Sequence, residues 1–125
     1  MNKISFVVFS LLALIVILTS SCKHDPITPL SDARTISFAT DVQPIIIANC
    51  TQSGCHGTSG SRKLKLVTYD EIASIVSSGK PHSSSLYTSI TSNVLNTMPK
   101  PPNPRLSDIQ IKTIYVWIMQ GAKNN

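Results

Sequence analysis

Two cysteines and the histidine that directly follows the second one, Cys50, Cys55 and His56, constrain this chain more than any other feature. This grouping is the attachment pattern of a c-type haem, in which the thiols bond to the porphyrin and the imidazole binds the iron. The usual spacing places two residues between the cysteines, whereas this chain has four. The pattern therefore predicts a small domain that holds one covalent haem c, with His56 as the proximal ligand of its iron.

Four other chemistries use the same residue types. A short-loop disulfide between Cys50 and Cys55 is the main alternative, because an exported chain lies where thiols oxidise. A zinc site usually needs four ligands, and besides these three side chains only His82 is a candidate. Thiol–disulfide exchange would normally use Cys-x-x-Cys, which is absent. An adjacent Cys–His pair also lacks the third group that orients a catalytic base.

A haem that shuttles electrons also needs a sixth ligand to its iron, and three residues are candidates. Met98 lies in a proline-rich segment, where Pro99 favours an extended backbone and the following prolines stiffen the loop around the thioether. Met119 falls inside an expected helix, where packing is the more common role. His82 follows a proline in another loop and is the main competitor. We expect Met98 to be the distal ligand.

The N-terminus has the pattern of an export signal. A short basic start is followed by an apolar run over residues 4–18, which is 15 residues long. A membrane-spanning helix needs roughly 20 such residues, so the run predicts a cleaved signal peptide over residues 1–21. Small residues ending in Cys22 resemble a bacterial lipoprotein signal, although Thr19 stands where leucine is usual. We expect lipidation of Cys22, and the alternative is ordinary cleavage with an incidental thiol.

The residues after Cys22 bear on location and partners. Lys23 replaces the aspartate that can retain a lipoprotein at the inner membrane, which favours the outer membrane, facing the periplasm or the cell exterior. Residues 22–36 are polar with two prolines and predict a lipidated tether, leaving residues 37–125 as the domain. The net charge of +5 is scattered, which argues against nucleic acid and allows an acidic redox partner.

Helical spacing and capping signals predict an all-α domain with about four helices and long loops. The first helix should be capped by Thr40 or Asp41, carry Pro44 in its first turn and end around Asn49. Residues 51–63 are rich in Gly, Ser and Thr and predict irregular structure. Their three glycines suit tight turns and a close approach to a flat ligand, and they are Gly54, Gly57 and Gly60.

Two capping boxes mark later helices. Thr68–Glu71 opens a short helix, and a serine run at residues 83–85 precedes another. Residues 96–106 contain four prolines and cannot form a helix or a central strand. Ser107–Gln110 is the second box, and it opens a terminal helix that should stop at Gly121. A domain this small has little core of its own, and a buried haem would supply apolar contact.

Residues 38–122 resemble the class I cytochrome c-like domain of small bacterial lipoproteins, in a group with the expanded Cys-x4-Cys-His spacing. The matching stretches follow the family's order and are residues 38–45, 50–57, 66–69, 85–87, 98–107 and 117–122. The resemblance implies a small helical fold around one covalent haem c. It also implies thioether bonds at Cys50 and Cys55, with His56 as proximal and Met98 as distal ligand.

These observations predict a membrane-tethered, single-haem electron carrier that exchanges electrons with redox partner proteins and is not itself an enzyme. An iron with both axial positions filled favours electron transfer over oxygen chemistry. One alternative is a non-redox surface lipoprotein, a binding module with a Cys50–Cys55 disulfide. Another is an enzyme or sensor with an open haem, which would require a displaceable Met98.

Overall fold

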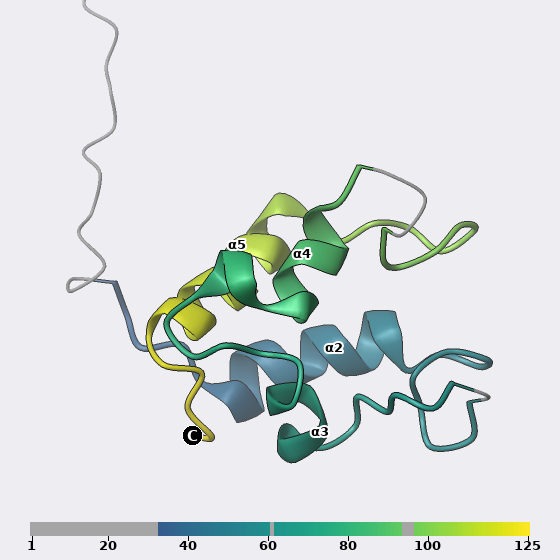
Figure 1. Ribbon diagram of the computed structural model, residues 1–125, viewed down its shortest axis with the longest axis horizontal. Helices are drawn as coiled ribbons and strands as arrows, with labels where there is room; N and C mark the ends of the chain where they lie inside the picture. The colour runs from purple at the N-terminus through teal and green to yellow at the C-terminus, as the bar shows by residue number, and fades with distance from the viewer. Residues whose placement is uncertain (1–32, 61, 94–96) are drawn as a thin grey trace, which may run out of the picture.

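The computed structural model describes residues 33–60, 62–93 and 97–125, and within these ranges the chain is all-α with no strand. Its elements in chain order are η2 (Phe38–Val42), α2 (Gln43–Cys50), α3 (Tyr69–Ala73), η3 (Pro81–Ser83), α4 (Ser85–Thr91) and α5 (Asp108–Met119). The prediction of about four helices joined by long loops is confirmed. In Figure 1, α4 and α5 lie on one side of α2 and α3 lies on the other.

The predicted signal peptide (residues 1–21), the lipidation site Cys22 and the tether as far as residue 32 lie outside the described residues. Within the described part of the chain, no helix has both the length and the apolar character needed to span a bilayer.

The first helical segment begins earlier than predicted. Ser37, not Thr40 or Asp41, is the N-cap, and its hydroxyl accepts a hydrogen bond from the Thr40 N–H. The Asp41 carboxylate instead accepts a hydrogen bond from the Ser37 N–H, and the Asp41 N–H donates to the Ser37 carbonyl at 3.0 Å. The capping prediction was wrong because the chain first forms the wide turn η2. Pro44 occupies the first turn of α2, as predicted.

Both predicted capping boxes are confirmed. The Thr68 side chain accepts a hydrogen bond from the Glu71 N–H, and the Glu71 carboxylate accepts one from the Thr68 N–H. Ser107 and Gln110 make the same reciprocal pair at the start of α5. Gly121 follows α5 with a φ of +101°, a left-handed conformation that suits glycine at a helix end.

One apolar core joins these elements. It consists of Ile36, Phe38, Val42, Ile46, Cys50, Leu66, Ile72, Leu86, Ile90, Leu106, Ile114, Trp117, Ile118 and Ala122. Within it, the Phe38 ring lies 5.7 Å from the Trp117 ring and meets the Tyr69 ring edge-on at 5.1 Å. On α5, the side chains of Ile114, Trp117 and Ile118 are buried in this core, whereas those of Ile111 and Val116 are only partly buried and pack against it.

The segment before η2 packs against the C-terminal residues. The Ile36 N–H donates to the side-chain carbonyl of Gln120 at 2.8 Å, and the Ser37 hydroxyl donates to the Asn125 backbone oxygen at 2.7 Å. Tyr69 adds a hydrogen bond to the Ala122 carbonyl at 2.9 Å. The last residues of the predicted tether are thus part of the packed domain.

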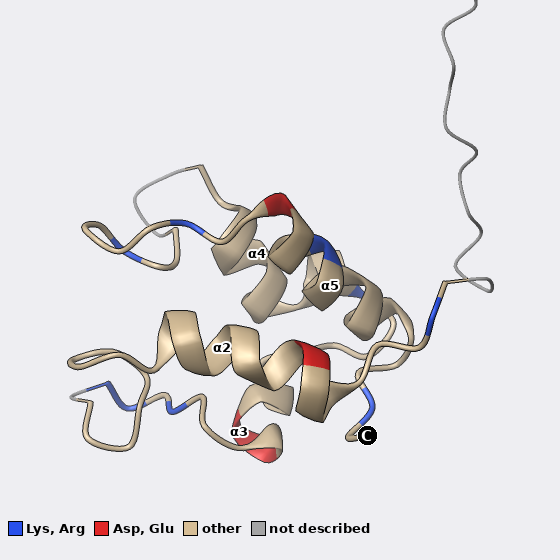
Figure 2. Cartoon of the chain, turned by 180° about the vertical axis from the view of Figure 1, so that it is seen from behind, with Lys and Arg blue, Asp and Glu red and all other residues tan. Residues whose placement is uncertain are grey.

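Two long loops leave the helical body at the same end, on the right in Figure 1. One follows α2 and the other joins α4 to α5. Figure 2 shows that many of the described lysines and arginines lie on these loops, whereas the described acidic residues lie on helices. The basic loop residues are Arg62, Lys63, Lys65, Lys100 and Arg105. This end of the molecule is therefore more positive than the rest.

Candidate functional site

The Cys50-to-His56 segment forms a closed turn at the C-terminal end of α2. Cys50 is the last residue of that helix, and its carbonyl accepts a hydrogen bond from the His56 N–H at 2.9 Å. Inside this turn, the Cys55 N–H donates to the Gln52 carbonyl at 2.8 Å, and Gly54 has a φ of +77°. Such a turn needs positive φ at its third residue. The four residues between the two cysteines are thus accommodated by this inner turn.

The glycines that follow bring the loop against its own backbone. A Cβ atom at Gly57 would lie 2.5 Å from the Thr51 carbonyl oxygen, and one at Gly60 would overlap the Cys55 carbonyl oxygen. The prediction that these glycines suit tight turns is confirmed at Gly54, whose φ is positive, and the close approach seen in the structure is to the chain's own backbone. The neighbour at Gly57 and Gly60 is the chain itself, so these glycines serve the shape of the loop that presents Cys55 and His56.

His56 is oriented by a hydrogen bond from its ring. Its Nδ1 atom lies 2.9 Å from the Leu64 carbonyl oxygen. Because a carbonyl oxygen only accepts, Nδ1 is the donor in this hydrogen bond, and Nε2 is the ring nitrogen left for another partner. Ring nitrogens that bind metals in proteins are usually oriented in this way, with the other nitrogen donating to a carbonyl or carboxylate. His56 is thus in the tautomer that a metal ligand requires.

Met98 reaches the same place from the other long loop. Its N–H donates to the Ser89 carbonyl at 2.9 Å, and this hydrogen bond holds the Met98 backbone against α4. Pro99 is buried directly after it. Cys50, His56 and Met98 then line two neighbouring cavities together. Three residues singled out from distant parts of the sequence therefore converge, and Cys55 lines one of the two cavities with them.

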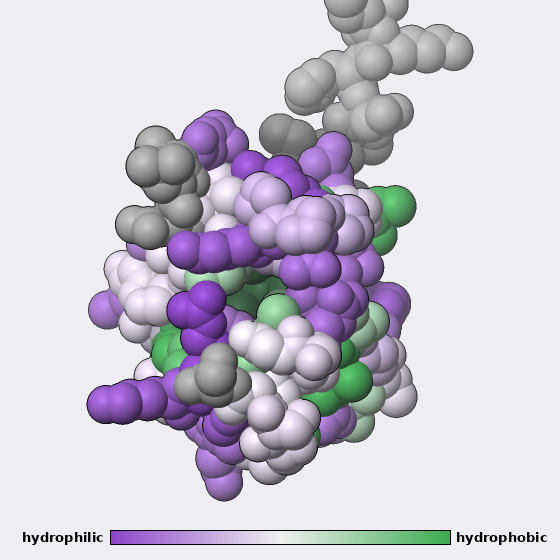
Figure 3. Space-filling view, turned by 90° about the vertical axis from the view of Figure 1, so that its right-hand side faces the viewer, coloured by the Kyte–Doolittle hydropathy of each residue, from purple (hydrophilic) through white to green (hydrophobic). Residues whose placement is uncertain are grey.

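The two cavities differ in character. The aliphatic cavity, about 100 Å³, is walled by side chains from the loop after α2, from residues after α3 and from α4, namely Leu64, Leu66, Ile75, Leu86 and Ile90. The loop cavity, about 60 Å³, also receives the polar residues Asn49, Arg62, Lys100 and Asn103. On the face that carries the loops, Figure 3 shows a hollow with a green, apolar floor between purple, polar side chains. The site is apolar inside and basic at its rim.

A polar atom beside Met98 lacks a partner. The Thr97 hydroxyl is buried and makes no hydrogen bond within the described residues. Leaving such a group unsatisfied costs about 1–3 kcal/mol.

The donor set suits a haem, but the space between the loops is smaller than a porphyrin. Small-molecule pockets usually enclose roughly 300–1,000 Å³, well above either cavity. The two cavities adjoin, because Cys50, His56 and Met98 line both of them.

The two thiols differ in exposure. Cys50 is 8% exposed, and burial raises the pKa of its thiol to about 11, with the neighbouring Cys55 adding to the shift. Cys55 is half-buried, and both thiols are free. Cys50 is therefore a neutral thiol near pH 7, and Cys55 is the more accessible of the pair.

The other candidate ligands lie elsewhere. The His82 ring is exposed on η3 and packs edge-on against Tyr87, with ring centroids 5.3 Å apart. Neither His82 nor Met119 lines either of the two cavities. Among the described residues, no three His, Cys, Asp or Glu side chains gather closely enough to hold a metal ion. The zinc alternative thus lacks its usual ligand set there.

Sequence reasoning missed the Leu64 carbonyl and the basic residues at the rim, Arg62 and Lys100. Every residue carries a carbonyl, so no pattern could mark the one that bonds to His56. Arg62 and Lys100 belong to different loops, and only the folded chain brings them to one cavity.

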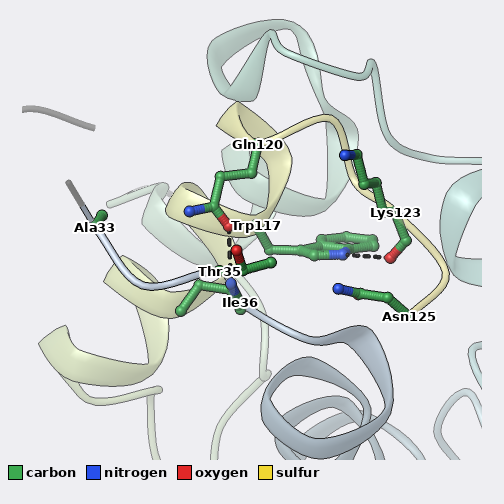
Figure 4. Close-up of a pocket in the computed structure, with 7 residues that line it drawn as sticks. All are labelled: Ala33, Thr35, Ile36, Trp117, Gln120, Lys123 and Asn125. Atoms are coloured by element: carbon green, nitrogen blue, oxygen red, sulfur yellow. Dashed lines mark hydrogen bonds between the residues drawn. The ribbon is translucent and has the colours of Figure 1, made fainter. Parts of the chain in front are cut away.

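A larger cavity of about 380 Å³ lies apart from this site (Figure 4). It is lined by residues near the C-terminus and before η2, including Trp117 and Gln120, and by no cysteine, histidine or methionine. Its polar groups bond to one another: the Trp117 indole N–H donates to the Lys123 carbonyl, and the Gln120 carbonyl accepts from the Ile36 N–H. Despite its size, none of its lining residues carries a thiol, an imidazole or a thioether, so we take the smaller paired cavities as the candidate site.

Comparisons with protein-family models, with curated proteins and with solved structures find no match to this chain.

Proposed function

We propose that this chain is a single-haem c-type cytochrome of the class I cytochrome c-like type, which carries electrons between redox partner proteins. The observation that carries the proposal is the convergence of Cys50, His56 and Met98 on the walls of two adjoining cavities. The Nδ1 hydrogen bond to Leu64 supports it further, because it leaves Nε2 of His56 free to bind iron.

Each residue has a distinct role in this proposal. The Cys50 and Cys55 thiols would bond to the porphyrin, His56 would bind the iron as the proximal ligand and Met98 would bind it as the distal ligand. The aliphatic side chains of Leu66, Leu86 and Ile90 exclude water from the ring. Haem iron bound by histidine and methionine supplies one-electron exchange at a raised reduction potential.

The proposed setting is the surface of a membrane. Lipidation at Cys22 would anchor the chain, most consistently at the outer membrane, and the polar tether would let the domain reach its partners. The basic loops at the candidate site suit a partner with an acidic surface.

The first test is a reduced-minus-oxidised visible spectrum of the mature chain, produced with haem-attachment machinery that accepts the wide spacing. A sharp reduced α-band, retained after denaturation, would support covalent haem. The matched variants are Cys50→Ser and Cys55→Ser, each expected to keep one bond, and the double variant, expected to lose haem on denaturation.

The alternative function predicts a different result. A binding module with a Cys50–Cys55 disulfide would be colourless in a host that matures a control cytochrome of the same spacing. Its mass would be about 2 Da below that of the reduced form, because disulfide formation removes two hydrogens. That outcome would refute the haem proposal.

A further inference from the structure

Residues 98–105 are the part of the α4–α5 loop that carries Met98, and both ends of this segment are attached to the C-terminal end of α4. At its start, the Met98 N–H donates to the Ser89 carbonyl at 2.9 Å. At its end, the Arg105 guanidinium donates to the Ile90 carbonyl at 3.3 Å and to the Ser92 carbonyl at 3.0 Å. One short stretch of α4 and its C-cap therefore holds both ends of the loop.

The end of a helix is well suited to this task. The last four carbonyls of an α-helix lack partners within the helix, and they carry the negative end of its dipole. In α4 these carbonyls include those of Ser89 and Ile90, which the two ends of the loop satisfy. A guanidinium fits there better than a neutral donor, because its charge is favourable at a helix C-terminus.

Little else holds the middle of the loop. Residues Pro101, Pro102 and Pro104 are exposed, and the Asn103 N–H bonds only within the loop, to the Lys100 carbonyl at 3.1 Å. The buried side chains at its two ends are Pro99 and Leu106. In the described ranges of the chain, Arg105 has no ion-pair partner, and its hydrogen bonds there go to this helix end.

We propose that Arg105 is a positioning residue, which holds the Met98 thioether at the iron by fastening the far end of the loop to α4. This inference rests on the proposed function, since it concerns the distal ligand. Releasing Arg105 leaves the loop more conformations, so Met98 spends more time away from the cavity. An added ligand then competes with Met98 more successfully.

The test is imidazole binding to the ferric, haem-loaded full chain, followed by loss of the absorbance near 695 nm that marks methionine ligation. Arg105→Gln is expected to bind imidazole about tenfold more tightly than the parent, the effect of losing one hydrogen bond from a charged group. The imidazole affinity of Arg105→Lys is expected to lie between those of the parent and Arg105→Gln, because an ammonium group keeps the charge but loses the paired N–H donors of the planar guanidinium.

Arg34→Gln is the matched control. Arg34 is also an exposed arginine, and its guanidinium donates two hydrogen bonds to the Asp41 carboxylate and a long one to the Thr35 carbonyl. Neither Asp41 nor Thr35 lines either cavity. This variant should bind imidazole as the parent does. Equal affinity in the parent and Arg105→Gln would overturn the inference, and so would an equal increase in Arg34→Gln, which would indicate general loosening.

A second measurement separates this inference from the haem proposal. Amide hydrogen exchange on the full chain as it is purified, with or without haem, reports directly on the Met98 N–H bond to Ser89. Faster exchange at Met98 in Arg105→Gln, but not in Arg34→Gln, would support the fastening role even if the parent carried no haem. A parent without haem would refute the proposed function, whereas unchanged exchange at Met98 would refute the role of Arg105.

Discussion

His56 makes two hydrogen bonds to the segment that contains Leu64 and Leu66, one through its ring and one through its backbone carbonyl. The Nδ1 atom lies 2.9 Å from the Leu64 carbonyl oxygen, and the Leu66 N–H donates to the His56 carbonyl at 2.9 Å. The imidazole is thus held between its own turn and the segment that contributes Leu64 and Leu66 to the aliphatic cavity. A ring held in this way loses less conformational entropy when it binds a ligand than a freely rotating ring would.

Met98→Leu tests the distal ligand while keeping most of the packing volume. We expect haem to remain attached, the absorbance near 695 nm to disappear and imidazole to bind much more tightly. Met119→Leu is the control, because Met119 lies on α5 and lines neither cavity. An unchanged six-coordinate spectrum in Met98→Leu would rule out Met98 as the ligand.

Gly60→Ala tests the shape of the attachment loop. A Cβ atom there would overlap the Cys55 carbonyl oxygen, so the backbone around Cys55 must move. We expect a stability loss of about 1–3 kcal/mol and a lower yield of covalent haem. Ser59→Ala, at an exposed neighbouring position, should change neither quantity. A Gly60→Ala chain with parental stability and haem content would show that the loop is not constrained here.

Ile46 and Ile47 provide a matched pair on α2. The Ile46 side chain is fully buried, whereas Ile47 is 39% exposed. Ile46→Ala should lower the free energy of unfolding by about 2–5 kcal/mol, because it removes buried methyl groups and leaves a cavity. Ile47→Ala should cost clearly less. Chemical denaturation of both variants measures the difference, and equal losses would contradict the arrangement of the core.

Glu71 predicts a specific dependence of stability on pH. Hydrogen bonds from the Thr68 N–H, and then from the Val67 N–H, lower the pKa of its carboxyl below the ordinary 4.5. A lowered pKa means that the stabilisation is present above pH 4.5 and is lost as the pH falls through the folded-state value. Glu71→Gln removes this titration. Unfolding midpoints of the parent and the variant should therefore converge as the pH is lowered from about 6 to about 3, and a constant gap would contradict the assignment.

Local signals predicted local structure well. The capping boxes at Thr68 and Ser107 were confirmed because each forms between residues only three apart. The cap of the first helix was predicted wrongly, since Asp41 bonds both to the Ser37 N–H and to Arg34. Competing partners of that kind cannot be ranked from the order of residues.

The sequence by itself determined which chemistry is available: two thiols, an adjacent imidazole, and a thioether in a loop stiffened by prolines. Only the tertiary structure decided which of these groups meet. Met98 lies beside Cys50 and His56 because the loop before α5 bonds to the end of α4, while His82 faces outward against Tyr87. Both residues follow plausible local patterns. Only contacts between distant segments distinguish Met98 from His82 as a candidate ligand, because burial and long-range hydrogen bonds depend on the whole fold.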